Sequence, residues 1–183
     1  MLEKIPGTAL PFNISAAENC YSLISPLLTV TKGLTLSQVT ELTGLETSTI
    51  QNWVKRGFLS GPKNKRYSLD QLCRIININM LKSVLPLERI CSLLGYVNGQ
   101  LDDESDDMID DTKLYFMFVS LASRMKELRD YEAGAKLLDA YLADYEEPVP
   151  GARARIEKAL RVMLTAWVAA RMRHAAEKML QEL

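Results

Sequence analysis

The chain has 183 residues, 48% of them hydrophobic and 25% charged, and its formal net charge is −1 at pH 7. This length is enough for one hydrophobic core, or for a small head with a helical body, and this composition excludes wholesale disorder. Because no apolar run approaches the roughly 18 residues of a membrane span, and because the N-terminus lacks the layout of a signal peptide, we expect a cytoplasmic protein.

The small net charge hides a strong asymmetry along the chain. Residues 1–100 carry 10 basic and 6 acidic side chains, whereas residues 101–150 carry 5 basic and 14 acidic ones. Residues 47–69 contain five basic side chains and no acidic one. Because a phosphate backbone responds to the local potential rather than to the total charge, this segment is a candidate contact for nucleic acid.

The first 33 residues are predicted to form an N-terminal extension. Two prolines and a glycine in residues 1–14 favour an extended lead-in, and residues 15–24 favour a short helix that Pro26 stops.

Two short helices joined by a glycine turn are predicted next. Thr35 and Gln38 form a capping box, in which each side chain can satisfy a free backbone N–H at the start of the first helix. Gly44 ends that helix and permits a tight reversal. The second helix covers residues 47–56, with Thr47 as its candidate cap.

A basic hairpin and two further helices follow. Residues 57–67 contain two glycines, a proline and three basic residues, which is typical of a hairpin or wing. Ser68 and Gln71 form a second capping box and open a longer helix. Pro86 suits the first turn of a fourth helix that ends near Gly95.

Residues 98–111 are predicted to be a solvated acidic linker. A calcium-binding loop is the alternative, but the segment has no glycine at the sixth position and no suitably placed bidentate glutamate.

The remaining residues, 112–183, are predicted to form a C-terminal helical domain. Its first helix has a narrow apolar seam at spacings of four and three: Leu114, Phe118, Leu121, Met125 and Leu128. A second helix carries Leu137, Leu138, Tyr141 and Tyr145, and ends before Pro148. The last helix has one apolar row, Ile156, Leu160, Met163, Trp167 and Ala170, and a second one, Leu164, Val168, Met172 and Met179. Because such a helix has to be covered on two sides, we expect a homodimer through these helices.

The predicted fold is therefore all-α with a small wing hairpin. It divides into the extension (1–33), a winged helix-turn-helix head (34–97), the acidic linker (98–111) and the helical domain (112–183). The second helix of a helix-turn-helix fits the major groove of double-stranded DNA. In this chain it exposes Ser48, Gln51 and Asn52, whose side chains suit contacts with base edges.

The basic residues around that helix are placed to straddle the flanking phosphates. For each of these features the alternative is a solvated surface, since helical hairpins with polar outer faces are common in proteins that bind no DNA.

Four stretches of the chain resemble the DNA-binding head of MerR-type regulators, and they follow one another in the order of that family. They are Leu34–Leu45, Thr49–Leu59, Lys65–Leu72 and Leu87–Leu94, and they span about 64 of the 183 residues. More narrowly, Thr49–Gly57 is similar to an uncharacterised bacterial family with a MerR-like head and a helical tail. The resemblance implies a head that reads the major groove and grips the backbone with its wing.

The resemblance also implies roles for single residues. It places Ser48, Gln51 and Asn52 against bases, and puts further residues at backbone-contacting or wing-anchoring positions: Trp53, Lys55, Lys65 and Tyr67. Together with the basic residues, the predicted DNA interface comprises Ser48, Gln51, Asn52, Trp53, Lys55, Arg56, Lys63, Lys65, Arg66 and Tyr67. The chain departs from the family pattern at residues 51–53, where Gln-Asn-Trp replaces Arg-Tyr-Tyr, and at Glu46, where the family prefers a small capping residue.

No catalytic motif, phosphate loop or cluster of metal ligands is recognisable, so we predict neither an enzyme nor a cofactor. Cys20, Cys73 and Cys91 are odd in number and widely spaced, which indicates unpaired core thiols rather than a metal or redox site. His174 is predicted to lie on a helix surface. The alternatives to a transcriptional regulator are a protein-interaction adaptor that has lost DNA binding and a small architectural or excisionase-like factor.

Overall fold

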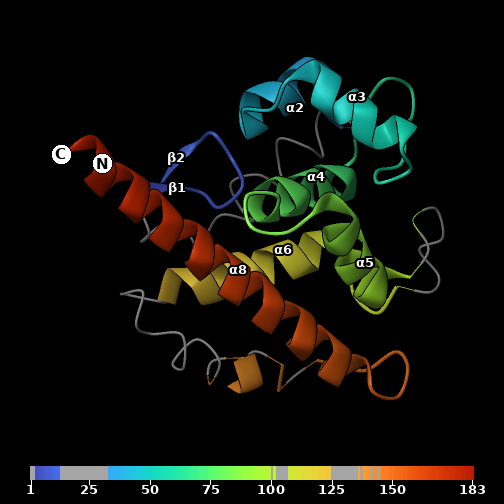
Figure 1. Cartoon of the computed structure of the whole chain (residues 1–183). Helices are drawn as coiled ribbons and strands as arrows, with labels where there is room; N and C mark the ends of the chain where they lie inside the picture. Colours follow the sequence, from blue (N-terminus) through green and yellow to red (C-terminus); the bar gives the residue numbers. More distant parts are fainter. Residues whose placement is uncertain are drawn as a thin grey trace.

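The computed structural model describes residues 3–12, 33–99, 101, 107–124, 136, 138–140, 142–143 and 145–183. This part of the chain is mainly helical, which confirms the predicted fold class at that level (Figure 1). Its elements are β1 (Glu3–Lys4), β2 (Pro11–Phe12), α2 (Leu36–Thr43), α3 (Thr47–Lys55), α4 (Leu69–Leu81), α5 (Leu87–Asn98), α6 (Asp111–Arg124) and α8 (Ala152–Gln181). The predictions for the helix over 15–24, for Cys20 and for Met125, Leu128, Leu137 and Tyr141 fall outside the described residues.

Both predicted capping boxes are present. The Thr35 side chain accepts the N–H of Gln38 at the start of α2, and that of Ser68 accepts the N–H of Gln71 at the start of α4. Gly44 ends α2 in the left-handed conformation, with φ at +69°.

The start of α3 differs from the prediction by one residue. Glu46 is the N-cap, with extended φ and ψ, and its side chain makes no capping hydrogen bond. Thr47 is already the first helical residue. The turn that precedes α3 consists of Gly44, the buried Leu45 and the N-cap Glu46.

The fourth predicted helix is longer than expected. α5 begins after its N-cap Pro86 and runs through Gly95 to Asn98. A glycine inside a helix lowers its stability but does not end it, and a Cβ at Gly95 would meet nothing within 4 Å. The helix ends at Gly99, whose φ of +61° lies outside the helical region.

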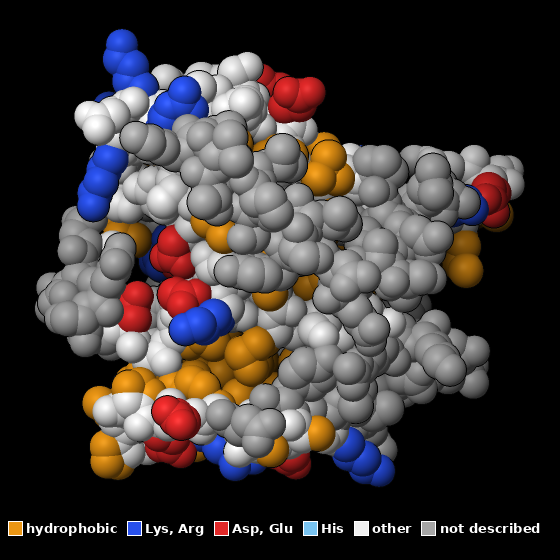
Figure 2. Space-filling model, turned by 180° about the vertical axis from the view of Figure 1, so that it is seen from behind, with side chains coloured by type: hydrophobic (Ala, Val, Ile, Leu, Met, Phe, Trp, Pro, Cys, Tyr) orange, Lys and Arg blue, Asp and Glu red, His pale blue; other side chains and the backbone are white. Residues whose placement is uncertain are grey.

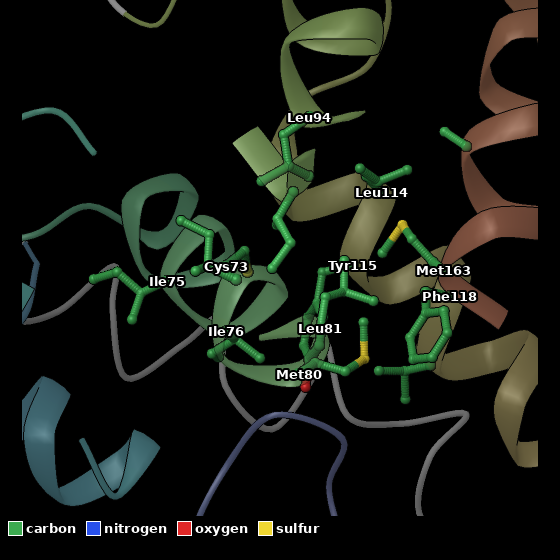
Figure 3. Close-up of a cluster of buried hydrophobic side chains, with 14 of the residues drawn as sticks. Cys73, Ile75, Ile76, Met80, Leu81, Leu94, Leu114, Tyr115, Phe118 and Met163 are labelled. Carbon is green, nitrogen blue, oxygen red and sulfur yellow. The ribbon is translucent and has the colours of Figure 1, made fainter. Parts of the chain in front are cut away.

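α4 lies at the centre of the core, with nine of its thirteen residues buried (Figure 3). It packs on α2 and α5 from the head and on α6 and α8 from the C-terminal part. The buried apolar residues of both parts form one cluster, in which Ile75 and Leu94 share the core with Leu114 and Phe118. The described helices after residue 111 therefore share one core with the head, whereas the sequence led us to expect a separate helical domain there. The reason is that α4 has buried residues on most of its sides, and α2 and α5 cover only part of them.

The 30 residues of α8 differ in burial between the two halves of the helix. All of its buried side chains lie between Ala152 and Ala166 and pack towards α4, α5 and α6, as the spacing of Ile156, Leu160 and Met163 predicts. Beyond Ala166 every residue is half-buried or exposed, and this end of the helix runs past α4 and α6 (Figure 1). None of the described helices has the length and hydropathy of a membrane span.

The N-terminal residues form a hairpin instead of an extended lead-in. β1 and β2 pair antiparallel, with Glu3 opposite Phe12. The loop between them docks on the core, because the Asn79 amide donates to the Gly7 carbonyl (2.9 Å) and the Tyr115 hydroxyl donates to the Pro6 carbonyl (2.9 Å). These contacts join residues more than 70 positions apart, which a local pattern does not reveal.

Polar side chains of α4 hold the start of α6. The Asp70 carboxylate accepts both the backbone N–H (2.9 Å) and the hydroxyl (3.0 Å) of Thr112. Inside the core, Arg74 forms an ion pair with Asp111 (3.0 Å), and its Nε donates to the Phe58 carbonyl (3.2 Å). One buried guanidinium therefore connects α4, the segment after α3 and the first residue of α6.

We predict that Gly7→Ala lowers the free energy of unfolding more than Gly57→Ala. Both glycines have positive φ, +75° and +73°, which costs an alanine about 1 kcal/mol. A Cβ at Gly7 would also lie 2.5 Å from the Ile76 carbonyl oxygen, whereas one at Gly57 would meet nothing within 4 Å. Urea denaturation should give a loss for Gly7→Ala at least about twice that for Gly57→Ala. Equal losses would show that the N-terminal loop is not held against α4.

We also predict that the cost of Asp111→Asn depends on pH. Burial raises the pKa of Asp111 from 3.8 to about 6, and the nearby Arg74 opposes this rise only in part. The folded chain therefore binds a proton in a range where the unfolded chain does not, so this contribution to stability is present at low pH and is lost as the pH rises through about 6. Asparagine does not titrate, so its cost in free energy of unfolding should be larger at pH 5 than at pH 7.5, by roughly 1 kcal/mol. A cost that is the same at both pH values would contradict the raised pKa.

Candidate nucleic-acid interface

The outer face of α3 is polar and open to solvent. Ser48, Gln51, Asn52 and Lys55 are exposed, while Ile50 on the opposite side is fully buried. The amphipathic pattern of the helix produces this arrangement, since apolar residues at positions 50 and 53 hold it against the core. The three residues predicted to face bases therefore lie on one accessible surface.

A tight turn carries the basic residues that follow α3. The Arg66 N–H donates to the Lys63 carbonyl (2.9 Å), and the two residues between them, Asn64 and Lys65, have φ of +51° and +61°. Positive φ at both central positions is the backbone conformation of type I′ turns. Positive φ costs a lysine conformational energy, and this conformation places the exposed Lys65 side chain at the tip of the turn.

Backbone and amide hydrogen bonds fix this turn to the core. Leu34 and Tyr67 exchange two backbone hydrogen bonds, of 2.9 and 2.7 Å. The Gln71 amide donates to the carbonyl and hydroxyl of Ser60 and to the carbonyl of Gly61, at 2.9–3.3 Å. The second capping box therefore also clamps the segment between α3 and the turn, a role that sequence patterns do not disclose.

The predicted basic residues fall into two groups. Arg56 forms an ion pair with Glu88 (2.5 Å) and stacks on the Phe58 ring (4.5 Å), and Arg66 donates to the Gly33 carbonyl (2.9 Å). In contrast, the side chains of Lys55, Lys63 and Lys65 are exposed and have no ion-pair or hydrogen-bond partner within the described part of the chain. These three lysines are the ones available to an incoming anion.

Trp53 and Tyr67, which the resemblance placed at backbone-contacting or wing-anchoring positions, are core residues. Trp53 is 4% exposed and Tyr67 is 2% exposed. Their side chains therefore anchor α3 and the turn instead of presenting a surface. The Lys82 ammonium lies 5.9 Å from the centre of the Trp53 ring, and partial burial lowers the pKa of Lys82. Sequence reasoning missed this lysine, because it lies in the connection between α4 and α5.

An apolar hollow of about 430 Å³ lies between α3 and the turn. Its walls combine α2, α3 and the turn segment: Leu36, Gln51, Val54, Pro62, Lys65 and Tyr67.

A second hollow, of about 800 Å³, has an acidic lining and lies between the starts of α4 and α6 and residues 145–148. Figure 2 shows a group of Asp and Glu side chains on this face of the molecule, and Lys and Arg side chains at the end that α3 and the turn occupy as well as along the opposite edge. No group of three or more histidine, cysteine or carboxylate side chains in the described ranges is spaced to hold a metal ion. Cys73 and Cys91 are free thiols, and burial raises the pKa of both. His174 is exposed on α8 beside Glu177.

Comparison with known proteins gives a family for this chain. The model of a domain of unknown function, DUF1836, matches residues 27–118. The chain belongs to the DUF1836 family. The DUF1836 match starts before α2 and ends inside α6, so it crosses the predicted boundary at residue 111 and includes the helix that completes the cover of α4.

One relative of this DUF1836 chain is the uncharacterized protein YkrK of Bacillus subtilis (strain 168), which is 34% identical over 84 residues. The match covers 44% of this chain and 36% of YkrK, so it spans about a third of that relative's length. No solved structure matches the chain.

Proposed function

We propose that this protein binds double-stranded DNA through α3 and the turn at residues 63–66, and that it acts as a transcriptional regulator. One observation carries the proposal: exposed Ser48, Gln51 and Asn52 lie beside three exposed lysines, at positions 55, 63 and 65, in a segment without acidic residues. Amide side chains pair with adenine in the major groove, and lysines contact the phosphates on either side.

The order of the elements supports a MerR-like winged helix-turn-helix. In this proposal α2 and α3 form the helix-turn-helix, with a three-residue turn between Thr43 and Thr47. The turn at residues 63–66 is the tip of a short wing, and the backbone bonds between Leu34 and Tyr67 join it to the head. α4 and α5 correspond to the third and fourth helices of that head.

We further propose that the protein is a homodimer through α8. One face of this helix, opposite its buried side, carries small and apolar residues at alternating spacings of three and four: Val162, Thr165, Ala169, Met172, Ala176 and Met179. This spacing is the pattern of a two-helix seam, and all six side chains are exposed or half-buried in the single chain. Two heads on a two-fold axis would read a palindromic site with twice the base contacts.

Lys65→Gly is predicted to weaken DNA binding without destabilising the fold. Glycine adopts positive φ more readily than lysine, so the turn is kept while the charge is lost. Binding-site selection from random duplexes should first yield a preferred sequence. On that duplex the variant should show a slope of log affinity against log salt that is flatter by about 0.9, since one phosphate contact is lost.

Lys158→Ala, which removes an exposed charge on α8, is the matched control and should leave the slope unchanged. If the native chain selects no sequence and its affinity for duplex DNA does not fall with salt, the adaptor alternative replaces the DNA-binding one.

Met179→Glu is predicted to dissociate the dimer. It places a carboxylate in the proposed seam, whereas Gln181→Glu adds the same charge on another side of the exposed end of α8. Light scattering should give about twice the chain mass of 20.6 kDa for the native protein and for Gln181→Glu, and one chain mass for Met179→Glu. A native chain that stays at 20.6 kDa even with its selected duplex would refute the dimer.

A further inference from the structure

The apolar hollow between α3 and the turn adjoins the surface that we assign to DNA, and nothing in the proposed function uses it. Leu36, Val54 and Pro62 supply aliphatic walls, and the buried Tyr67 lies among them. Gln51, one of the exposed base-facing residues, and Lys65, at the tip of the turn, complete its lining.

Hydrogen bonds hold the segment that lines the hollow in place. The Gln71 amide holds the carbonyls of Ser60 and Gly61, directly before Pro62. A Cβ added at Gly61 would lie 3.8 Å from the Val54 side chain, so the loop runs close beside α3 at this point. The backbone bonds of Leu34 and Tyr67 fix the other end of the segment.

The charges around the hollow select its occupant. Lys55, Lys63 and Lys65 are exposed, and residues 47–69 contain no acid, so an anionic partner is favoured. The partner also has to present an apolar group within reach of an amide. In the major groove the base edges present one such group, the 5-methyl group of thymine, and the adenine that suits Gln51 is paired with thymine.

We propose that this hollow reads the 5-methyl group of a thymine at or next to the base pair contacted by Gln51. The inference rests on the proposed DNA binding and adds a specificity element to it. Val54, Leu36 and Pro62 exclude water around the methyl group, and the aliphatic stem of Lys65 closes the hollow while its ammonium group stays in solvent. The volume of about 430 Å³ also admits the C5–C6 edge of the base.

The test is a thymine-to-uracil scan of the selected duplex, because deoxyuridine lacks only the methyl group. At one thymine position, uracil should lower the affinity of the native chain about four-fold, the effect of removing one buried methyl group. Val54→Thr keeps the shape of the side chain and makes the wall polar, so thymine and uracil should then bind equally at that position. Val84→Thr, at an exposed valine outside the hollow, should keep the four-fold difference.

The exposed Pro62→Ser serves as a second variant should Val54→Thr unfold, and it should reduce the same difference. A chain that selects a DNA sequence but shows no uracil position with more than a two-fold effect overturns the methyl pocket and leaves the proposed function intact. A uracil effect that persists in both hollow variants also overturns it, since the methyl group is then read elsewhere. If the chain shows no salt-dependent binding to duplex DNA, both the proposed DNA binding and the methyl pocket are refuted.

Discussion

The arrangement of the molecule depends on one buried guanidinium. Arg74 lies in the middle of α4, where most of the buried side chains are apolar, and it is 7% exposed. A charge in such a place is tolerable only when it is paired, and its partners are the Asp111 carboxylate and the Phe58 carbonyl. These partners fix where α6 begins and where the chain leaves α3. The position of the candidate reading helix is thereby tied to a helix that the sequence assigns to another domain.

Local chemistry made part of this architecture predictable. Both capping boxes and the left-handed glycine after α2 are short-range features, and each is found where the side chains indicate. The end of α5 was predicted too early, because a glycine such as Gly95 is a stop signal only when the backbone needs its conformational freedom. The N-terminal hairpin was not predictable, since its evidence lies in contacts with Asn79 and Tyr115.

The location of the candidate site was predictable from the sequence, but which of its residues are exposed and which are already engaged in contacts was not. Spacing alone identified the exposed amides of α3 and the basic turn. It did not separate lysines that are free from arginines that are already engaged, because Glu88 lies 32 positions from Arg56. The family resemblance placed Trp53 and Tyr67 at the interface, but both are buried and support it from within the core. The aromatic residues of such a head are read more safely as core until their exposure is known.

The central position of α4 has a consequence for the order in which the chain folds during synthesis. Ribosomes extend a chain at about 5–20 residues per second, and a domain of local contacts can fold as soon as it has emerged. Here the face of α4 that receives α6 and α8 stays open until residues as late as Ala166 are available. The loop around Pro6 likewise waits for Tyr115. The buried face of α4 therefore stays incompletely covered while residues 82–166 are synthesised, and an apolar surface exposed for that long makes a nascent chain prone to aggregate.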